Sequence, residues 1–123
     1  MEVLLVTSRR SGRWLIPKGW QMEGLSLAEA AAREAYEEAG VHGIIDQAPF
    51  GWFTHDKQHD LFGPMRVRIA VHLLAVDREL SSWPELGERK RRWFSPRQAI
   101  EQVQSEGLAA LISQLRSSAR LRR

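Results

Sequence analysis

The chain of 123 residues contains no cysteine, which excludes disulfide bonds and thiolate metal sites. No apolar run approaches the roughly 18 residues that a membrane-spanning helix needs, and the N-terminal residues lack the layout of a signal peptide. We therefore expect no membrane association and, by default, a cytoplasmic location. The length allows one domain with a real core and is too short for two, so we expect a single domain over residues 1–123.

Acidic residues are also scarce at one end of the chain. The last eight residues, 116–123, hold four arginines and no acid, and without them the formal net charge of +3 becomes −1. The sequence pI of about 9.9 is thus mostly a property of a basic C-terminal tail that begins at about residue 116. Arginines at a helix C-terminus suit the helix dipole. This distribution argues against a nucleic-acid ligand, although an RNA-binding tail stays open as an alternative.

Periodicity and turn residues predict the elements in order. We expect strands over 2–7 and 14–16, and a helix over 27–39 that opens with a capping box at Ser26 and Glu29 and ends at Gly40. Further strands are expected over 43–53 and 66–76, with loops over 54–65 and 77–88 and a last short strand over 92–94. A helix should span 96–104, with a helical apolar stripe after Gly107. This order indicates one α/β or α+β domain.

The most informative run is Arg33 to Val41, REAYEEAGV. Glu34, Glu37 and Glu38 fall within about one turn of the predicted helix, since a turn takes about 3.6 residues. Hard divalent cations favour clustered carboxylate oxygens, and magnesium commonly binds through one or two of them plus substrate phosphates. Three glutamates on a helix are nevertheless more often a solvated acidic face. From the carboxylates alone, that second interpretation is favoured.

The residues around the glutamates change this balance. The stretch from Gly19 to Val41, GWQMEGLSLAEAAAREAYEEAGV, resembles the Nudix box of the Nudix hydrolases. Two departures are visible. Leu25 occupies the position of the first glutamate of the box, and the family fold usually has a strand before the one at 2–7. The box positions in register are Gly19, Arg33, Glu34, Glu37, Glu38, Gly40 and Val41.

The resemblance implies an α/β/α sandwich with a mixed β-sheet between helices, which could lack the usual first strand. A partner chain or another segment would then cover the strand at 2–7, which leaves a homodimer open. The resemblance also implies that Glu34 and Glu38 coordinate Mg²⁺ or Mn²⁺, that Glu37 ligates a further cation, and that the backbone carbonyl of Lys18 is an additional ligand. Gly19 and Gly40 would be structural.

Arg33 would orient the glutamates, and Glu29 or Glu23 could pair with it in place of the missing glutamate at Leu25. The implied reaction is attack of water on a phosphorus of a pyrophosphate link. A glutamate of the box, or Glu85 or Glu88 outside it, would accept the proton.

Residues 8–14 and 88–94 resemble the branch of the family that hydrolyses diphosphoinositol polyphosphates and diadenosine polyphosphates. Such substrates need several cationic donors. The substrate contacts that we expect are Arg9, Arg13, Lys18, Lys57 and Lys90, with Arg10 behind them. ADP-ribose or another nucleoside diphosphate derivative is the next choice, and a non-catalytic nucleotide- or RNA-binding module is the alternative from another class.

Overall fold

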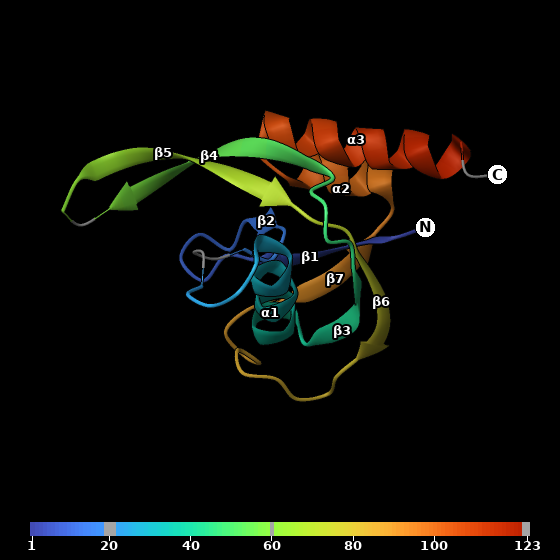
Figure 1. The fold of residues 1–123 in the computed structure, drawn as a ribbon, viewed down its shortest axis with the longest axis horizontal. Helices are drawn as coiled ribbons and strands as arrows, with labels where there is room; N and C mark the ends of the chain where they lie inside the picture. Colours follow the sequence, from blue (N-terminus) through green and yellow to red (C-terminus); the bar gives the residue numbers. More distant parts are fainter. Residues whose placement is uncertain (19–21, 60, 122–123) are drawn as a thin grey trace.

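The computed structural model describes residues 1–18, 22–59 and 61–121, and it describes no side chains for 57–59 and 116–121. Ten elements follow one another (Figure 1). They are β1 (Val3–Thr7), β2 (Trp14–Leu15), α1 (Leu27–Ala39), β3 (Val41–Ile45), β4 (Gly51–His59), β5 (Gly63–Val71), β6 (Leu74–Glu79), β7 (Arg91–Phe94), α2 (Pro96–Gln102) and α3 (Glu106–Leu121).

The α/β class is confirmed, but the arrangement of its strands differs from the expected single mixed sheet. The named strands form three antiparallel sheets, in the orders β2-β1-β7, β3-β6 and β4-β5. The first strand of the chain, β1, is therefore a central strand. Val6 pairs with Leu15 of β2 and with Arg91 of β7, so both edges of β1 are paired at this point. Of the two covers expected for β1, a partner chain or another segment, the structure shows the second at this point.

Side chains that alternate along β1 enter two separate cores. Leu5 packs with Phe53, Phe94 and residues of α2 and α3, whereas Val6 packs with Ala35, Ala39 and Val41. Successive side chains of a strand point to opposite faces, which places β1 between two layers. In Figure 1, α2 and α3 accordingly lie above β1 and β7, while α1 and β3 lie below them. The helices thus cover opposite faces of the β2-β1-β7 sheet.

The bounds of α1 follow from its sequence. Ser26 accepts a hydrogen bond from the backbone of Glu29, the Glu29 side chain accepts one from Ser26, and Gly40 ends the helix with φ 64° and ψ 42°. Both signals were expected, and α1 spans the predicted 27–39. A capping box at Ser95 and Gln98 likewise opens α2, which ends at Gln102 instead of 104.

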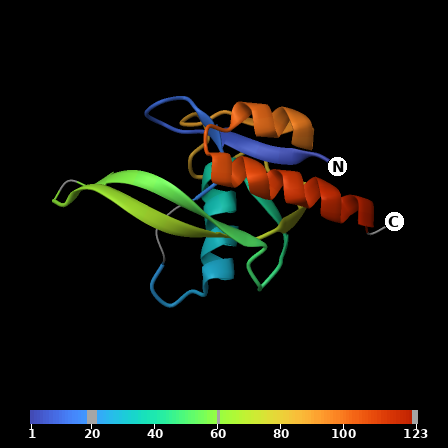
Figure 2. The same cartoon turned by 90° about the horizontal axis from the view of Figure 1, so that it is seen from above.

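The expected bounds of the middle strands are wrong. The predicted strand over 43–53 is divided between β3 and β4, and the one over 66–76 between β5 and β6. Most of the predicted loop over 54–65 belongs to the β4–β5 hairpin, which projects away from the rest of the molecule (Figure 2). Its polar residues hid the alternation: Phe53 and His55 lie on the more buried face, and Thr54 and Asp56 are exposed.

The turn between β5 and β6 explains the second division. His72, expected on a strand face, follows the end of β5, and its Nδ1 lies 3.0 Å from the carbonyl oxygen of Asp46. The amide of Asp46 donates to the carbonyl of Leu73 at 2.9 Å. These bonds fix a turn where the sequence shows an uninterrupted apolar alternation.

Replacing Gly40 should test how the end of α1 is built. Gly40 and Gly24 both have positive φ, at 64° and 80°, but a Cβ at Gly40 would collide with the Trp83 ring, whereas one at Gly24 would meet open space. The left-handed conformation costs a non-glycine residue about 1–2 kcal/mol. Gly40→Ala should therefore lower the free energy of unfolding by clearly more than the matched Gly24→Ala, as measured by urea unfolding. Equal losses would contradict the packing of Trp83 against this turn.

Candidate active site

The carboxylates predicted to act together lie on the last two turns of α1. Glu38 is buried, with 3% of its surface exposed, while Glu34 and Glu37 are half-buried and Arg33 is exposed. A buried carboxylate among the alanines of a helix face is costly unless it is hydrogen-bonded or paired. Glu38 therefore requires hydrogen-bonding or charged partners around its carboxyl group.

Three groups surround the Glu38 carboxyl. Glu34 forms a side-chain hydrogen bond with it, the backbone amide of Lys18 donates to its Oε1 at 3.4 Å, and Arg89 Nη1 lies 3.8 Å from the same oxygen. Burial, followed by the hydrogen bond with Glu34, raises the pKa of Glu38 to about 8, against a partial lowering by the charge of Arg89. Glu38 therefore keeps its proton near neutral pH as long as no cation is bound beside it.

This arrangement fits a divalent cation. The buried Glu38 carboxyl holds a proton beside a second carboxyl group, and a cation could bind these oxygens instead, with release of that proton. The carbonyl of Lys18 is the expected further ligand, and the backbone amide of the same residue donates a hydrogen bond to Glu38. Among the described residues, which leave out 19–21, no three acidic or histidine side chains are gathered in a cluster that could hold a metal ion. A cation here would thus need backbone, water or phosphate oxygens besides the two carboxylates, which is common for magnesium.

The expected brace for Arg33 is wrong. Glu29 does not pair with Arg33, because its carboxylate closes the capping box by accepting from the Ser26 amide at 3.0 Å. Arg33 instead donates through Nε to Glu37 Oε1 at 3.2 Å. The other proposed partner, Glu23, is exposed in the loop. Arg33 thus bonds directly to one of the box carboxylates.

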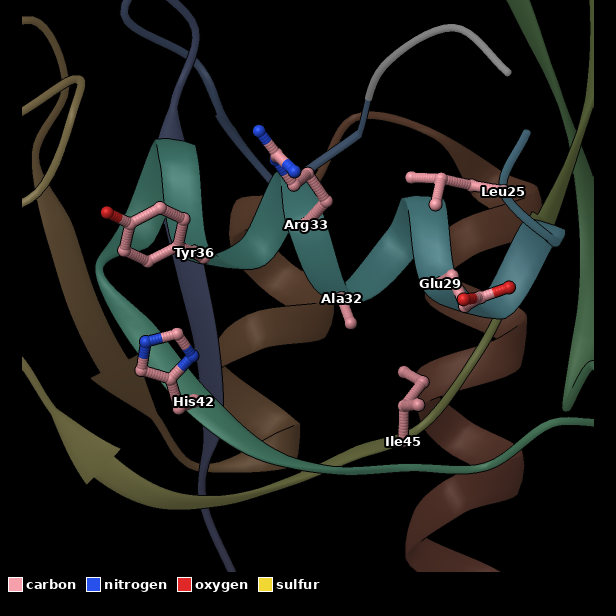
Figure 3. A pocket seen from close by; sticks show the side chains of 7 residues that line it. All are labelled: Leu25, Glu29, Ala32, Arg33, Tyr36, His42 and Ile45. Carbon is pink, nitrogen blue, oxygen red and sulfur yellow. The ribbon is translucent and has the colours of Figure 1, made fainter. Parts of the chain in front are cut away.

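Leu25, at the position of the missing glutamate, lines an apolar groove between α1 and β3 (Figure 3). The groove has a volume of about 360 Å³. Tyr36 and His42 stack at its other end, with ring centroids 5.0 Å apart. Leu25 therefore contributes apolar surface where the family motif has a carboxylate.

Two acids outside the box were expected to be available for proton transfer, and both are paired. Glu85 Oε1 accepts from Arg89 Nε at 2.8 Å, and Glu88 Oε1 accepts from Arg9 Nη1 at 3.1 Å. The Glu85–Arg89 pair is largely buried, and the Glu88–Arg9 pair is about half exposed. Of the two, Glu88 is the one that a substrate could separate from its partner at small cost.

The structure brings some of the expected substrate residues to one edge. Arg9 reaches Glu88 from the β1–β2 turn, and the amide of Lys90 donates to Thr7 Oγ1 at 2.9 Å at the end of β1. Arg13 is exposed at the other end of the same turn, where its carbonyl accepts from Ser8. The side chain of Lys57 and all of Gly19 lie outside the described residues. Arg9, Arg13 and Lys90 are thus gathered about the end of β1.

Sequence reasoning missed Arg89. Its side chain is 11% exposed, lies beside Glu38, bonds to Glu85, and donates through Nη1 to the Thr7 carbonyl at 3.2 Å. Arg89 stands in a run of four basic residues, 89–92, and composition alone does not tell which of them point inward. No signal in the sequence could have found it, because residues 85–89 lie outside any helix and the contact of Arg89 with Glu38 is long-range.

Comparisons with known proteins show the family to which this chain belongs. The family model described as "NUDIX domain" matches residues 1–114. Nudix hydrolase 16, mitochondrial, of Arabidopsis thaliana is 38% identical over 103 residues, covering 82% of this chain and 57% of the relative. Diphosphoinositol polyphosphate phosphohydrolase 3-beta of Homo sapiens is 38% identical over 109 residues, covering 84% and 60%. The chain therefore spans little more than half the length of these curated relatives.

A solved structure shares the fold. The crystal structure of a C. elegans Ap4A hydrolase aligns with a TM-score of 0.61 and 18% identity over 96% of this chain and 86% of that one. The family model covers most of the sequence, and the chain belongs to the NUDIX domain family. Within the part of the chain that the structure describes, we find no helix that is both long and apolar enough to span a membrane.

The buried Glu38 carboxyl should make the stability of the metal-free protein depend on pH. Its free energy of unfolding should fall as the pH rises from about 5 to about 8. In this window native Glu38 keeps its proton, whereas the unfolded carboxyl, with a pKa near 4.5, has lost it, so the native state binds more protons. The loss from this group is on the order of 1 kcal/mol per pH unit.

Urea unfolding in the presence of a chelator measures this slope. Glu38→Gln, which cannot ionise, should flatten it, whereas the exposed Glu23→Gln should leave it as in the wild type. An unchanged slope in Glu38→Gln would contradict the assignment of the proton to Glu38.

Proposed function

We propose that this chain hydrolyses a pyrophosphate bond in a phosphate-rich small molecule, with a divalent cation held at Glu34 and Glu38. The observation that carries the proposal is the buried Glu38 carboxyl, hydrogen-bonded to Glu34 within the motif that defines the family. A folded protein without such a function would gain stability from an apolar residue at this buried position. The hydrolase names of the relatives support the same reaction class.

The proposed ligand set is the one that the resemblance to the Nudix box implies. Glu34, Glu38 and the carbonyl of Lys18 would hold Mg²⁺ or Mn²⁺, and Glu37 would ligate a further cation directly or through water. When bound, the cation would neutralise charge on the phosphoryl oxygens and lower the pKa of a bound water. Arg33 orients Glu37 through the bond at 3.2 Å. Gly40 is structural, because its left-handed backbone lets α1 end directly after the glutamates.

Proton transfer needs an acceptor close to the attacked phosphorus. Glu37 lies on the same helix turn as the two metal carboxylates, whereas Glu85 is held by the buried Arg89. We therefore prefer Glu37 to Glu85 as the proton acceptor. Glu88, with its exposed partner Arg9, is the remaining candidate outside the motif.

The substrate class is inferred from the cations at the end of β1. Arg9, Arg13 and Lys90 would bind the phosphates, with Lys18 and Lys57 as the further contacts expected from the sequence. One relative is named a diphosphoinositol polyphosphate phosphohydrolase, and one structural neighbour is named an Ap4A hydrolase. Both names describe substrates that carry many phosphates. The single-domain organisation over 1–123 and the cytoplasmic location stay predictions.

Removal of a metal carboxylate should abolish the reaction. Glu38→Gln should lower kcat/KM by at least about a hundredfold, because even residues that only support metal ligands contribute about 10–100-fold. Phosphate release from diadenosine polyphosphate, diphosphoinositol polyphosphate and ADP-ribose, with Mg²⁺ or Mn²⁺ added, measures the effect. Glu23→Gln is the matched control and should keep wild-type rates. Turnover that survives Glu38→Gln, or wild-type protein inactive on every substrate, would refute the proposal.

The cations at the end of β1 should distinguish polyphosphate substrates from ADP-ribose. Arg9→Gln should raise KM for the two polyphosphate substrates several-fold more than for ADP-ribose, since a diphosphate offers fewer phosphates to these cations. Arg97→Gln changes an exposed arginine on α2, is the matched control and should alter none of the three KM values. Equal effects of Arg9→Gln on all three substrates would contradict the role of Arg9 in selecting polyphosphate substrates.

A further inference from the structure

The C-terminal end of α1 is held by a distant part of the chain. The last four carbonyl groups of an α-helix have no partner within the helix. Here the amide of Glu85 donates to the Glu37 carbonyl at 3.0 Å, and the amide of Leu80 donates to the Gly40 carbonyl at 2.8 Å. Both donors belong to residues 80–91, which we call the 80–91 segment. This segment joins β6 to the start of β7.

Arg91, the last residue of the segment, donates hydrogen bonds to three backbone carbonyl groups. Its Nη1 donates to the carbonyls of Ala39 at 2.8 Å and Gly40 at 3.2 Å, and its Nη2 donates to the carbonyl of Leu80 at 2.8 Å. No basic residue lies in the last turn of α1 itself. The guanidinium of Arg91 therefore supplies the positive charge that the C-terminal end of the helix dipole favours.

The surroundings hold this guanidinium in place. Its Cζ lies 4.1 Å from the centroid of the Trp83 ring, which also packs against Gly40. The backbone of Arg91 is paired with Val6 of β1, the central strand. Arg91 thus joins a rigid strand to the end of the helix that carries Glu37 and Glu38.

We propose that Arg91 is a positioning residue for the carboxylates of α1. It fixes the last turn through the Ala39 and Gly40 carbonyls, directly after Glu38, so that Glu37 and Glu38 face the substrate in one register. This inference rests on the proposed hydrolase function. Misplacement of a reacting group by about 1 Å can cost a hundredfold in rate. A lysine could not replace Arg91, because one ammonium lacks the planar fork that serves separate carbonyls.

The test compares Arg91→Met and Arg91→Lys with Arg92→Met, which changes the exposed neighbour on β7. Three quantities are measured where each variant is folded: amide exchange of Gly40, Leu80 and Glu85 in chelator, the affinity for Mn²⁺ alone, and kcat and KM separately. Both Arg91 variants should exchange these amides faster, bind Mn²⁺ about tenfold more weakly and lower kcat with little change in KM. Arg92→Met should behave as wild type.

Each outcome decides the question. Wild-type Mn²⁺ affinity and kcat in folded Arg91→Lys would overturn the proposal, even if Arg91→Met fails to fold. Reduced stability in both variants without loss of Mn²⁺ affinity or kcat would show a purely structural residue and would also overturn it. If the wild type neither binds Mn²⁺ nor releases phosphate, the proposed function fails. Amide exchange then still decides whether Arg91 holds the last turn of α1.

Discussion

The burial of one carboxyl group, that of Glu38, imposes an order on the surrounding structure. A carboxyl group out of water needs a proton, a hydrogen bond or a counter-ion. Glu34, the amide of Lys18 and the guanidinium of Arg89 meet this need from three parts of the chain. The helix, the residues after β2 and the segment before β7 therefore converge on one point. A protein selected only for stability would avoid such a group, so its presence indicates a function.

The helix that carries this carboxyl is fixed at both ends by different means. At the N-terminal end the capping box is local, since Ser26 and Glu29 satisfy each other. At the C-terminal end the partners come from the 80–91 segment, which is far away in sequence. Between the ends, Ala35 and Ala39 let α1 approach Val6 of β1 closely. The carboxylates thus stand on a rigid element, which is what a site requiring exact geometry needs.

The sequence predicted the local features of this arrangement and missed those that depend on distant contacts. The bounds of α1 were predictable because a capping box and a left-handed glycine are encoded within a few residues. The pairing of Arg33 was not, because Glu29 had two possible partners and the Ser26 amide took it. Likewise, the outer part of the β4–β5 hairpin, over 54–59 and 63–65, is mostly polar. It is held by backbone pairing, so no hydrophobic alternation predicts it. In the site itself, the three glutamates were predicted and Arg89 was not.

The run of basic residues 89–92 contains side chains with two different roles. The four basic residues 89–92 resemble a continuous surface for phosphates. Along the chain they alternate, however: Arg89 and Arg91 are turned inward to Glu38 and to the carbonyls of α1, while Lys90 and Arg92 are exposed. Lys90 is the expected substrate residue in this run, and its exposed side chain can reach a ligand. Selection among phosphate-rich substrates would then depend more on the β1–β2 turn, where Arg9 and Arg13 lie, than on this run.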